Sequence, residues 1–296
     1  MKVGNLKVGS RTVGFIGLGV MGEPMARHLR AACHDLAVWA RRPESAAALV
    51  AEGVPVCATP AELAARSEVV ITIVTSSADV EALAFGKNGL ADGFVRGAVH
   101  VDMSTIAPAM ARSLAQRYAT RGIGFVDAPV CGGGQGARDA SLAIMAGAES
   151  DILASVRPLL EAMGKRIVHV GPPGAGQVAK ACNQMIMVAA VQACAEAVRL
   201  ANAHGVDVAA VRSALMGGSA ASRVLEVMGA KMVERDFAAG IEARLHHKDF
   251  AILLDEASRL GTPLPIAAQV GQQRNALMGA GWGRDDTSSL LRVLER

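Results

Sequence analysis

The stretch VGFIGLGVMGEPMARHL (residues 13–29) decides the fold of this 296-residue chain. An apolar run typical of a strand leads into G-x-G-x-x-G at Gly17, Gly19 and Gly22, and a helical pattern follows. Glycines at this spacing allow a tight turn, close approach of a pyrophosphate, and close packing of helix on strand. The helix N-terminus adds N–H groups and a positive dipole. The stretch predicts a dinucleotide site; the alternative is a purely structural glycine turn. We expect the cofactor to contact the six residues of the turn, Gly17, Leu18, Gly19, Val20, Met21 and Gly22.

Short apolar runs continue to alternate with helical patterns as far as about Val170. The runs that predict strands are residues 13–17, 36–39, 69–74, 99–103 and 124–129. Strand–helix alternation is typical of βαβ units and a mostly parallel sheet. Because the runs are apolar at almost every position, helices are expected on both faces of the sheet.

The pattern changes at the breaker cluster GPPGAG (171–176), after which only helical segments are predicted. The sequence therefore predicts an α/β protein. An N-terminal Rossmann domain with a doubly wound parallel sheet (residues 1–172) is followed by an all-α C-terminal domain (residues 173–296). The length of the chain also favours two domains over one.

Composition excludes several classes of function. Hydrophobic residues make up 51% of the chain and charged residues 19%, which is typical of a globular protein. A net charge of +3, with Lys and Arg spread along the chain, argues against a nucleic-acid partner. The seven histidines show no metal-ligand spacing, so no metal is expected.

The sequence also favours a cytoplasmic location. The first eleven residues lack the apolar run of a secretory signal, so none is expected. The five cysteines form no CxxC pair, which suits reduced thiols. The apolar segment Met185–Ala203 is interrupted by Gln192, Glu196 and Arg199, which favours a buried soluble helix over a membrane span.

The end of the second predicted strand bears on the choice of cofactor. NAD sites usually place an Asp or Glu there for the ribose hydroxyls. This chain instead has Arg41 and Arg42 just after the strand. Two guanidinium groups suit a 2′-phosphate, so NADPH is favoured over NADH. The alternative is an arginine pair on a solvated loop.

Three motifs together carry a family resemblance: GLGVMGEPMA at 17–26, DAPVCGG at 127–133 and GAGQVAKACNQ at 174–184. In their order and spacing the chain resembles the β-hydroxyacid dehydrogenases over nearly its whole length. The run ALMGGSAASRVLEVMGAKM (214–232), the HHKD segment (246–249) and the pair Asn183–Gln184 most resemble the branch that reduces tartronate semialdehyde.

The resemblance implies that Lys180 is the catalytic residue. Reduction of an aldehyde places negative charge on its oxygen, and an ammonium can hydrogen-bond that oxygen and donate a proton. Asn183 and Gln184 follow at i+3 and i+4, on the same helix face, and are expected to bind substrate or orient the lysine. The alternative is a lysine that extends from an apolar helix to solvent.

The DAPVCGG motif implies the site of the substrate carboxylate. Its small residues Cys131, Gly132 and Gly133 expose backbone N–H groups that bind anions. The family usually has Ser at the position of Cys131, and a thiol is a weaker donor.

Further cofactor contacts are implied at three places. Val74 and Thr75 stand where the family often has Leu-Pro, and Ser104 and Thr105 are expected beside the nicotinamide. Lys248 is expected to reach the cofactor. The alternatives are an ordinary turn at residues 104–105 and a charged helix surface at Lys248.

The resemblance implies NADPH- or NADH-dependent interconversion of a short 3-oxo acid and its hydroxy acid, with tartronate semialdehyde favoured. Oxidation of 3-hydroxyisobutyrate and reduction of glyoxylate or succinic semialdehyde are the close alternatives. A non-catalytic dinucleotide-binding module is the alternative of a different class, and Lys180 argues against it. The apolar helix that begins near Gln177 suggests a homodimer or homotetramer.

Overall fold

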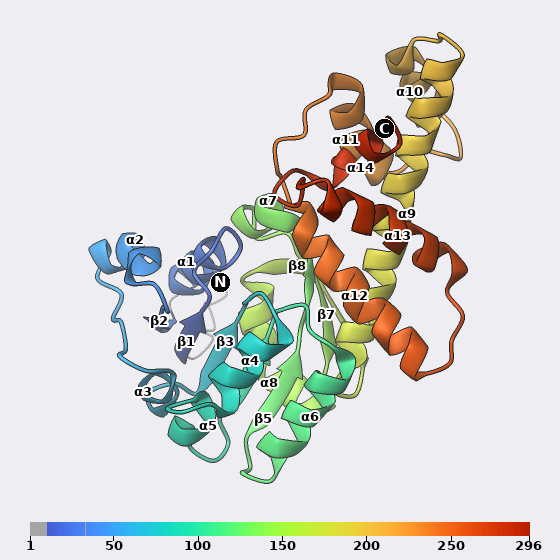
Figure 1. Ribbon diagram of the computed structural model, residues 1–296. Coiled ribbons are helices and arrows are strands. Elements are labelled where there is room, and N and C mark those ends of the chain that lie inside the picture. Colours follow the sequence, from blue (N-terminus) through green and yellow to red (C-terminus); the bar gives the residue numbers. More distant parts are fainter. Residues whose placement is uncertain (1–10, 33) are drawn as a thin grey trace, which may run out of the picture. The chain divides into compact units, whose positions relative to one another are not determined.

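The computed structural model describes residues 11–32 and 34–296 (Figure 1). The expectation about a secretory signal falls mostly on residues 1–10 and lies outside this part. The contacts of the chain divide it into two compact units, one as far as Lys180 and one from Ala181 to Arg296. The predicted domain boundary at residues 172/173 precedes the helix that carries Lys180.

The first unit is built on an eight-stranded sheet in the order β2-β1-β3-β4-β5-β7-β6, with β8 paired to β7. The strands are β1 (Thr12–Ile16), β2 (Asp35–Trp39), β3 (Val69–Thr72), β4 (Val99–Asp102), β5 (Gly124–Asp127), β6 (Val130–Cys131), β7 (Leu142–Gly147) and β8 (Gly164–Gly171). Strands β1–β5 are parallel, whereas β7 is antiparallel to both β5 and β6. The predicted Rossmann-type α/β fold with a parallel-dominated sheet is confirmed.

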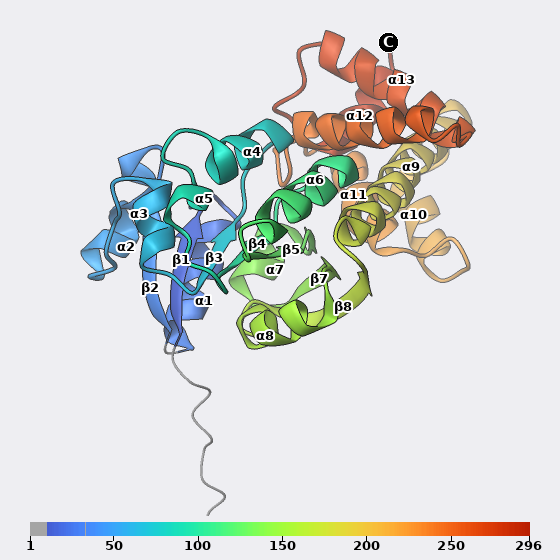
Figure 2. The same ribbon diagram turned by 90° about the horizontal axis from the view of Figure 1, so that it is seen from below.

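Helices cover both faces of this sheet (Figure 2). They are α1 (Gly22–Ala31), α2 (Ala47–Ala51), α3 (Pro60–Ala65), α4 (Ser77–Phe85), α5 (Leu90–Gly93), α6 (Pro108–Ala119), α7 (Gly133–Arg138) and α8 (Ser150–Glu161). A 3₁₀ turn, Pro43–Ala46, precedes α2.

Alternation along the strands explains the two layers. In β3, Val69 and Ile71 pack with residues of α1 and α8, whereas Val70 packs with residues of α3 and α5. Successive side chains of a strand point to opposite faces, so a strand that is apolar at every position needs cover on both sides. This confirms the reason for expecting helices on both faces.

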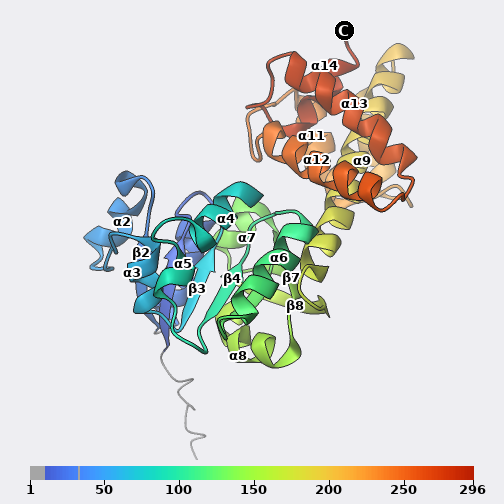
Figure 3. The same cartoon turned by 60° about the horizontal axis from the view of Figure 1, so that its bottom comes forward.

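The second unit is all-helical, as predicted (Figure 3). It contains most of α9 (Ala175–Ala203) together with α10 (Val208–Met216), α11 (Arg223–Glu234), α12 (Ala243–Arg259), α13 (Pro265–Gly279), the 3₁₀ turn Thr287–Ser289 and α14 (Leu290–Val293). Its core combines Val188, Val191 and Ala195 of α9 with apolar residues of α11–α14. The spacing of the three α9 residues, three and four apart, places them on one face of that helix.

Within the single chain, α9 is not buried on every face. Ile186 is 67% exposed and Leu200 63% exposed. Of the described residues, only this helix is long and apolar enough to span a membrane by length and composition, a test that core helices of soluble proteins also pass. Charged residues Glu196 and Arg199 interrupt its C-terminal half.

Candidate active site

The glycine turn joins β1 to α1, and its glycines differ in whether the surrounding structure leaves room for a side chain. Gly17 has φ +103°, and a Cβ there would lie 2.0 Å from the carbonyl oxygen of Ile73. A Cβ on Gly22 would lie 1.9 Å from the carbonyl oxygen of Gly17, whereas one on Gly19 would meet nothing within 4 Å. Gly17 and Gly22 are therefore required by the fold itself, while Gly19 leaves open space at the turn.

The apolar residues between the glycines of the turn differ in exposure. Leu18 is 8% exposed and packs in the core, and Val20 is 74% exposed. Met21 precedes α1 and makes no capping bond through its side chain. An uncapped helix N-terminus next to an open glycine fits the pyrophosphate of a dinucleotide.

The two arginines that follow β2 are exposed. The side chains of Arg41 and Arg42 are 79% and 74% exposed. Arg41 Nη1 lies 3.3 Å from Asp79 Oδ1, and Arg42 Nε lies 4.0 Å from Glu44 Oε1. Ion pairs this exposed are weak, so both guanidinium groups can turn to a stronger anion.

The ends of β3 and β4 are tied together by a hydrogen bond. The backbone N–H of Val74 donates to Ser104 Oγ (2.8 Å), and Ser104 Oγ donates to Asp102 Oδ1 (2.6 Å). Two predicted cofactor contacts, Val74 and Ser104, are thus bonded to each other, with Thr75 and Thr105 next along the chain. Asp102, which is fully buried, therefore helps to hold the ends of β3 and β4 together.

A neutral histidine lies behind Asp102. Thr72 Oγ1 donates to Asp102 Oδ1 (2.7 Å) and is 2.9 Å from His100 Nε2. Because the hydroxyl has one proton and gives it to the carboxylate, His100 Nε2 is the donor to Thr72. Burial lowers the pKa of His100 to about 3, so the ring is neutral at physiological pH.

Asp127, at the end of β5, anchors the start of α9. Its Oδ1 accepts from the backbone N–H of Gly174 (2.6 Å) and its Oδ2 from that of Gln177 (2.9 Å). Burial raises the pKa of Asp127 to about 7, against the opposite effect of these two hydrogen bonds. The first turn of α9 is therefore fixed to the edge of the sheet.

Lys180 lies one turn further along α9 and is 8% exposed. Its Nζ donates to the carbonyl oxygen of Val130 (2.8 Å) and lies 3.7 Å from Cys131 Sγ. Gly132 (φ +132°) and Gly133 (φ +60°) follow Cys131, and α7 begins at Gly133. The predicted catalytic lysine and the predicted carboxylate-binding segment are therefore neighbours in the first unit.

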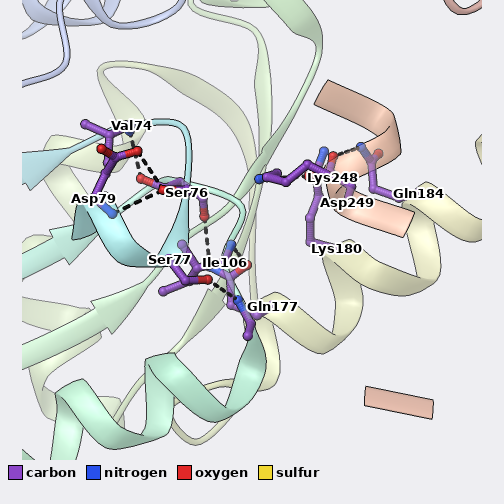
Figure 4. Close-up of polar contacts among 12 residues, drawn as sticks. Val74, Ser76, Ser77, Asp79, Ile106, Gln177, Lys180, Gln184, Lys248 and Asp249 are labelled. Carbon is purple, nitrogen blue, oxygen red and sulfur yellow. Dashed lines mark hydrogen bonds and ion pairs between the residues drawn. The ribbon is translucent and has the colours of Figure 1, made fainter. Parts of the chain in front are cut away.

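The second unit holds a chain of polar side chains (Figure 4). Asn183 Nδ2 donates to Gln184 Oε1 (3.0 Å), and Gln184 Nε2 donates to Asp249 Oδ2 (2.6 Å). Lys248 Nζ lies 2.9 Å from Asp249 Oδ1. Both ends of the Gln184 amide are thus engaged, and Asp249 holds both Gln184 and Lys248.

Several residues near these positions had no role predicted from sequence. Asp127 and Gln177 stand inside the quoted motifs, and Arg274 stands in a stretch without a motif. Arg274 is 1% exposed and donates through Nη2 to the carbonyl oxygen of Ala243. Burial lowers its pKa to about 10, and the charge of Asp249 acts in the opposite direction. Among the described residues, no group of three or more His, Cys, Asp or Glu is placed to hold a metal.

Comparison with known families agrees with this arrangement. A family model for the NAD binding domain of 6-phosphogluconate dehydrogenase matches residues 12–171. A second one, for the NAD-binding region of NADP-dependent 3-hydroxyisobutyrate dehydrogenase, matches residues 174–294. Together they span almost all of the described chain.

Individual relatives are similar over most of their length. The chain is 38% identical over 283 residues to 2-hydroxy-3-oxopropionate reductase of Escherichia coli K12, covering 96% of this chain and 97% of that protein. It is 34% identical to 3-hydroxyisobutyrate dehydrogenase of Pseudomonas aeruginosa, covering 86% and 88%. The solved structure of Mycobacterium tuberculosis 3-hydroxyisobutyrate dehydrogenase with L-serine matches with a TM-score of 0.90 and 29% identity, covering 97% of this chain and 100% of that one. The chain belongs to the 3-hydroxyisobutyrate dehydrogenase-like family of NAD(P)-dependent β-hydroxyacid dehydrogenases.

Proposed function

We propose that this oxidoreductase uses NADPH to reduce a short 3-oxo acid, with tartronate semialdehyde as the favoured substrate, and that Lys180 is its general acid. The observation that carries the proposal is the buried Lys180 ammonium beside Cys131 and the glycines that follow it. Similarity to the E. coli 2-hydroxy-3-oxopropionate reductase supports the choice of substrate.

Lys180 has a donor to spare for the reaction. A lysine ammonium carries three N–H donors, and the hydrogen bonds among the described residues use two of them, to Val130 and Cys131. The third can bind the aldehyde oxygen, stabilise the charge that develops there and then supply the proton. In the reverse direction the neutral lysine accepts the proton of the hydroxyl group.

The other residues of the site bind and orient. The turn at residues 17–22 would hold the pyrophosphate of the cofactor, and Ser104 and Thr105 would lie beside the nicotinamide, which supplies the hydride when bound. Val74, Thr75 and Lys248 are other proposed cofactor contacts. The backbone of residues 131–133 would bind the substrate carboxylate. Asn183 and Gln184 are the further proposed substrate contacts, and Gln184 is hydrogen-bonded to Asp249.

Initial rates with a panel of aldehydes test this function. Tartronate semialdehyde, methylmalonate semialdehyde, succinic semialdehyde and glyoxylate are each reduced with NADPH and with NADH. The expected result is the highest kcat/KM for tartronate semialdehyde with NADPH. Highest rates with methylmalonate semialdehyde would assign 3-hydroxyisobutyrate as the substrate of the reverse reaction, and negligible rates with all four would overturn the proposal.

Arg41→Ala is expected to weaken binding of NADPH about tenfold or more and to leave NADH almost unchanged. One charge-assisted hydrogen bond to a 2′-phosphate is worth about 1.5–3 kcal/mol. The Kd values of both cofactors can be measured by quenching of Trp fluorescence, with Arg157→Ala on α8, also an exposed, ion-paired arginine, as the control. Equal losses for both cofactors, or none, would contradict the assignment of NADPH.

We also propose a cytoplasmic homodimer or homotetramer. The exposed apolar residues of α9, Ile186 and Leu200, support contact with another subunit. The four described cysteines are free thiols, which suits a reducing compartment. A monomer in sedimentation velocity at micromolar concentration would contradict the oligomer.

A further inference from the structure

Gln177 makes a contact for which the proposed function has no role yet. It lies in the first turn of α9 and is 1% exposed. Its side-chain Nε2 donates to the carbonyl oxygen of Ser104 (2.9 Å), and its Oε1 accepts from the backbone N–H of Ile106 (3.1 Å) (Figure 4). The two bonds lie on either side of Thr105, so a single side-chain amide is hydrogen-bonded to both ends of the turn Ser104–Ile106.

The backbone of Gln177 is held as firmly as its side chain. Its N–H donates to Asp127 Oδ2 (2.9 Å) at the end of β5. The turn that its side chain grips follows β4 and is held from the other side, where Ser104 Oγ bonds Asp102. Gln177 therefore joins two neighbouring strand ends to the start of α9.

Lys180 follows Gln177 by three residues on the same helix. Residues three apart lie on one face of a helix, with Cβ atoms about 5–6 Å apart. A rigid helical turn thus separates the group proposed to give the proton from the amide that fixes the Ser104–Ile106 turn. A shift between that turn and α9 would therefore strain or break the two Gln177 side-chain bonds.

We propose that Gln177 is a positioning residue, which holds the Ser104–Ile106 turn in a fixed position relative to Lys180. The hydride can then reach the carbon, and the proton the oxygen, of the same carbonyl group. The role rests on the proposed function, because that function assigns Thr105 to the nicotinamide and Lys180 to the aldehyde oxygen. Misplacement of reacting groups by about 1 Å can cost about 10²-fold in rate, so two hydrogen bonds are enough to matter.

Gln177→Leu tests the proposal, because leucine keeps most of the volume and makes neither bond. The matched control is Gln192→Leu on the same helix, where a glutamine that is 5% exposed bonds, among the described residues, only Glu196 one turn along. We expect Gln177→Leu to lower kcat about 10- to 100-fold with a little-changed Kd for NADPH. The primary isotope effect with 4-deuterated NADPH should rise, because hydride transfer becomes slower, and the Ile106 amide should exchange its hydrogen faster than in the control.

Gln177→Glu supplies a rescue that a merely structural role would not show. A neutral carboxylic acid has a carbonyl acceptor and a hydroxyl donor, so it can make both bonds of the amide, whereas the carboxylate repels the carbonyl oxygen of Ser104. The ratio of the kcat of Gln177→Glu to that of the wild type should therefore rise as the pH falls.

The outcomes separate this inference from the proposed function. A wild-type chain that reduces none of the four aldehydes overturns the proposed function and this role of Gln177 with it. An active wild type beside a Gln177→Leu variant with the same kcat and isotope effect overturns the role alone. If Gln177→Leu does not fold, the pH dependence of Gln177→Glu decides, and a ratio that does not change with pH overturns the proposal.

Discussion

Replacing Lys180 by alanine is expected to lower kcat by about 10²–10⁴-fold while NADPH still binds. The ammonium is the donor that bonds Val130 and faces Cys131, and alanine leaves no group there to supply the proton. Among the described residues, the hydrogen bonds of this side chain go to Val130 and Cys131, and neither lies in the glycine turn or at the ends of β3 and β4, where the cofactor is expected. We therefore expect Lys180→Ala to lower kcat and the single-turnover rate constant of hydride transfer. The Kd for NADPH, measured by fluorescence, should stay almost unchanged.

The Lys180→Ala variant needs two controls. Lys165→Ala on β8 removes an exposed lysine from the same unit and should have wild-type kcat. Added methylamine should restore part of the activity of Lys180→Ala, because a small ammonium ion can occupy the vacated space and donate the proton. Loss of NADPH binding along with turnover would mean that Lys180 serves the cofactor site, and full activity would mean that it has no part in the chemistry.

The first half of the fold could be predicted because its strands are continuous apolar runs. Strands β7 and β8 had no such signal. β7 reads LAIMAG, rich in alanine and glycine, which are poor strand formers. β8 contains Lys165, Arg166 and His169 and is mostly exposed, because it lies at the end of the sheet and pairs only with β7. Local apolar patterning identifies strands rich in large and β-branched apolar residues, including β2 at an edge of the sheet. It misses β7, which is buried but rich in small residues, and β8, which is mostly exposed.

The site was predictable only where a motif gave the residues together. Lys180 and Cys131 belong to two quoted motifs, and the structure brings them within 3.7 Å. The bonds of Gln177 to the Ser104 turn instead join residues 71 and 73 apart in sequence. Arg274 is an arginine that is 1% exposed, against the usual preference of its type for the surface. Long-range partners and unusual burial leave no trace in local sequence.

The glycine turn provides the second large effect, because two of its glycines differ in what surrounds them. Gly22→Ala would place a Cβ 1.9 Å from the carbonyl oxygen of Gly17 and 2.9 Å from Ile73 Cγ2. Since the backbone oxygen cannot yield alone, α1 must move away from β1. We expect a loss of about 1–3 kcal/mol or more in the free energy of unfolding in urea, together with loss of NADPH binding.

Gly19→Ala is the matched variant, because a Cβ there meets nothing within 4 Å and the residue does not have positive φ. The stability of the cofactor-free protein should be unchanged, or higher by about 0.4–1 kcal/mol from the smaller entropy of the unfolded chain. The same methyl group would occupy the space through which the pyrophosphate approaches the backbone, so the Kd for NADPH should rise about tenfold or more. Equal destabilisation by the two alanines would mean that the space at Gly19 is not open. Unchanged NADPH affinity in Gly19→Ala would mean that the pyrophosphate does not lie against this turn, and the assignment of residues 17–22 to the cofactor would fail even with the fold intact.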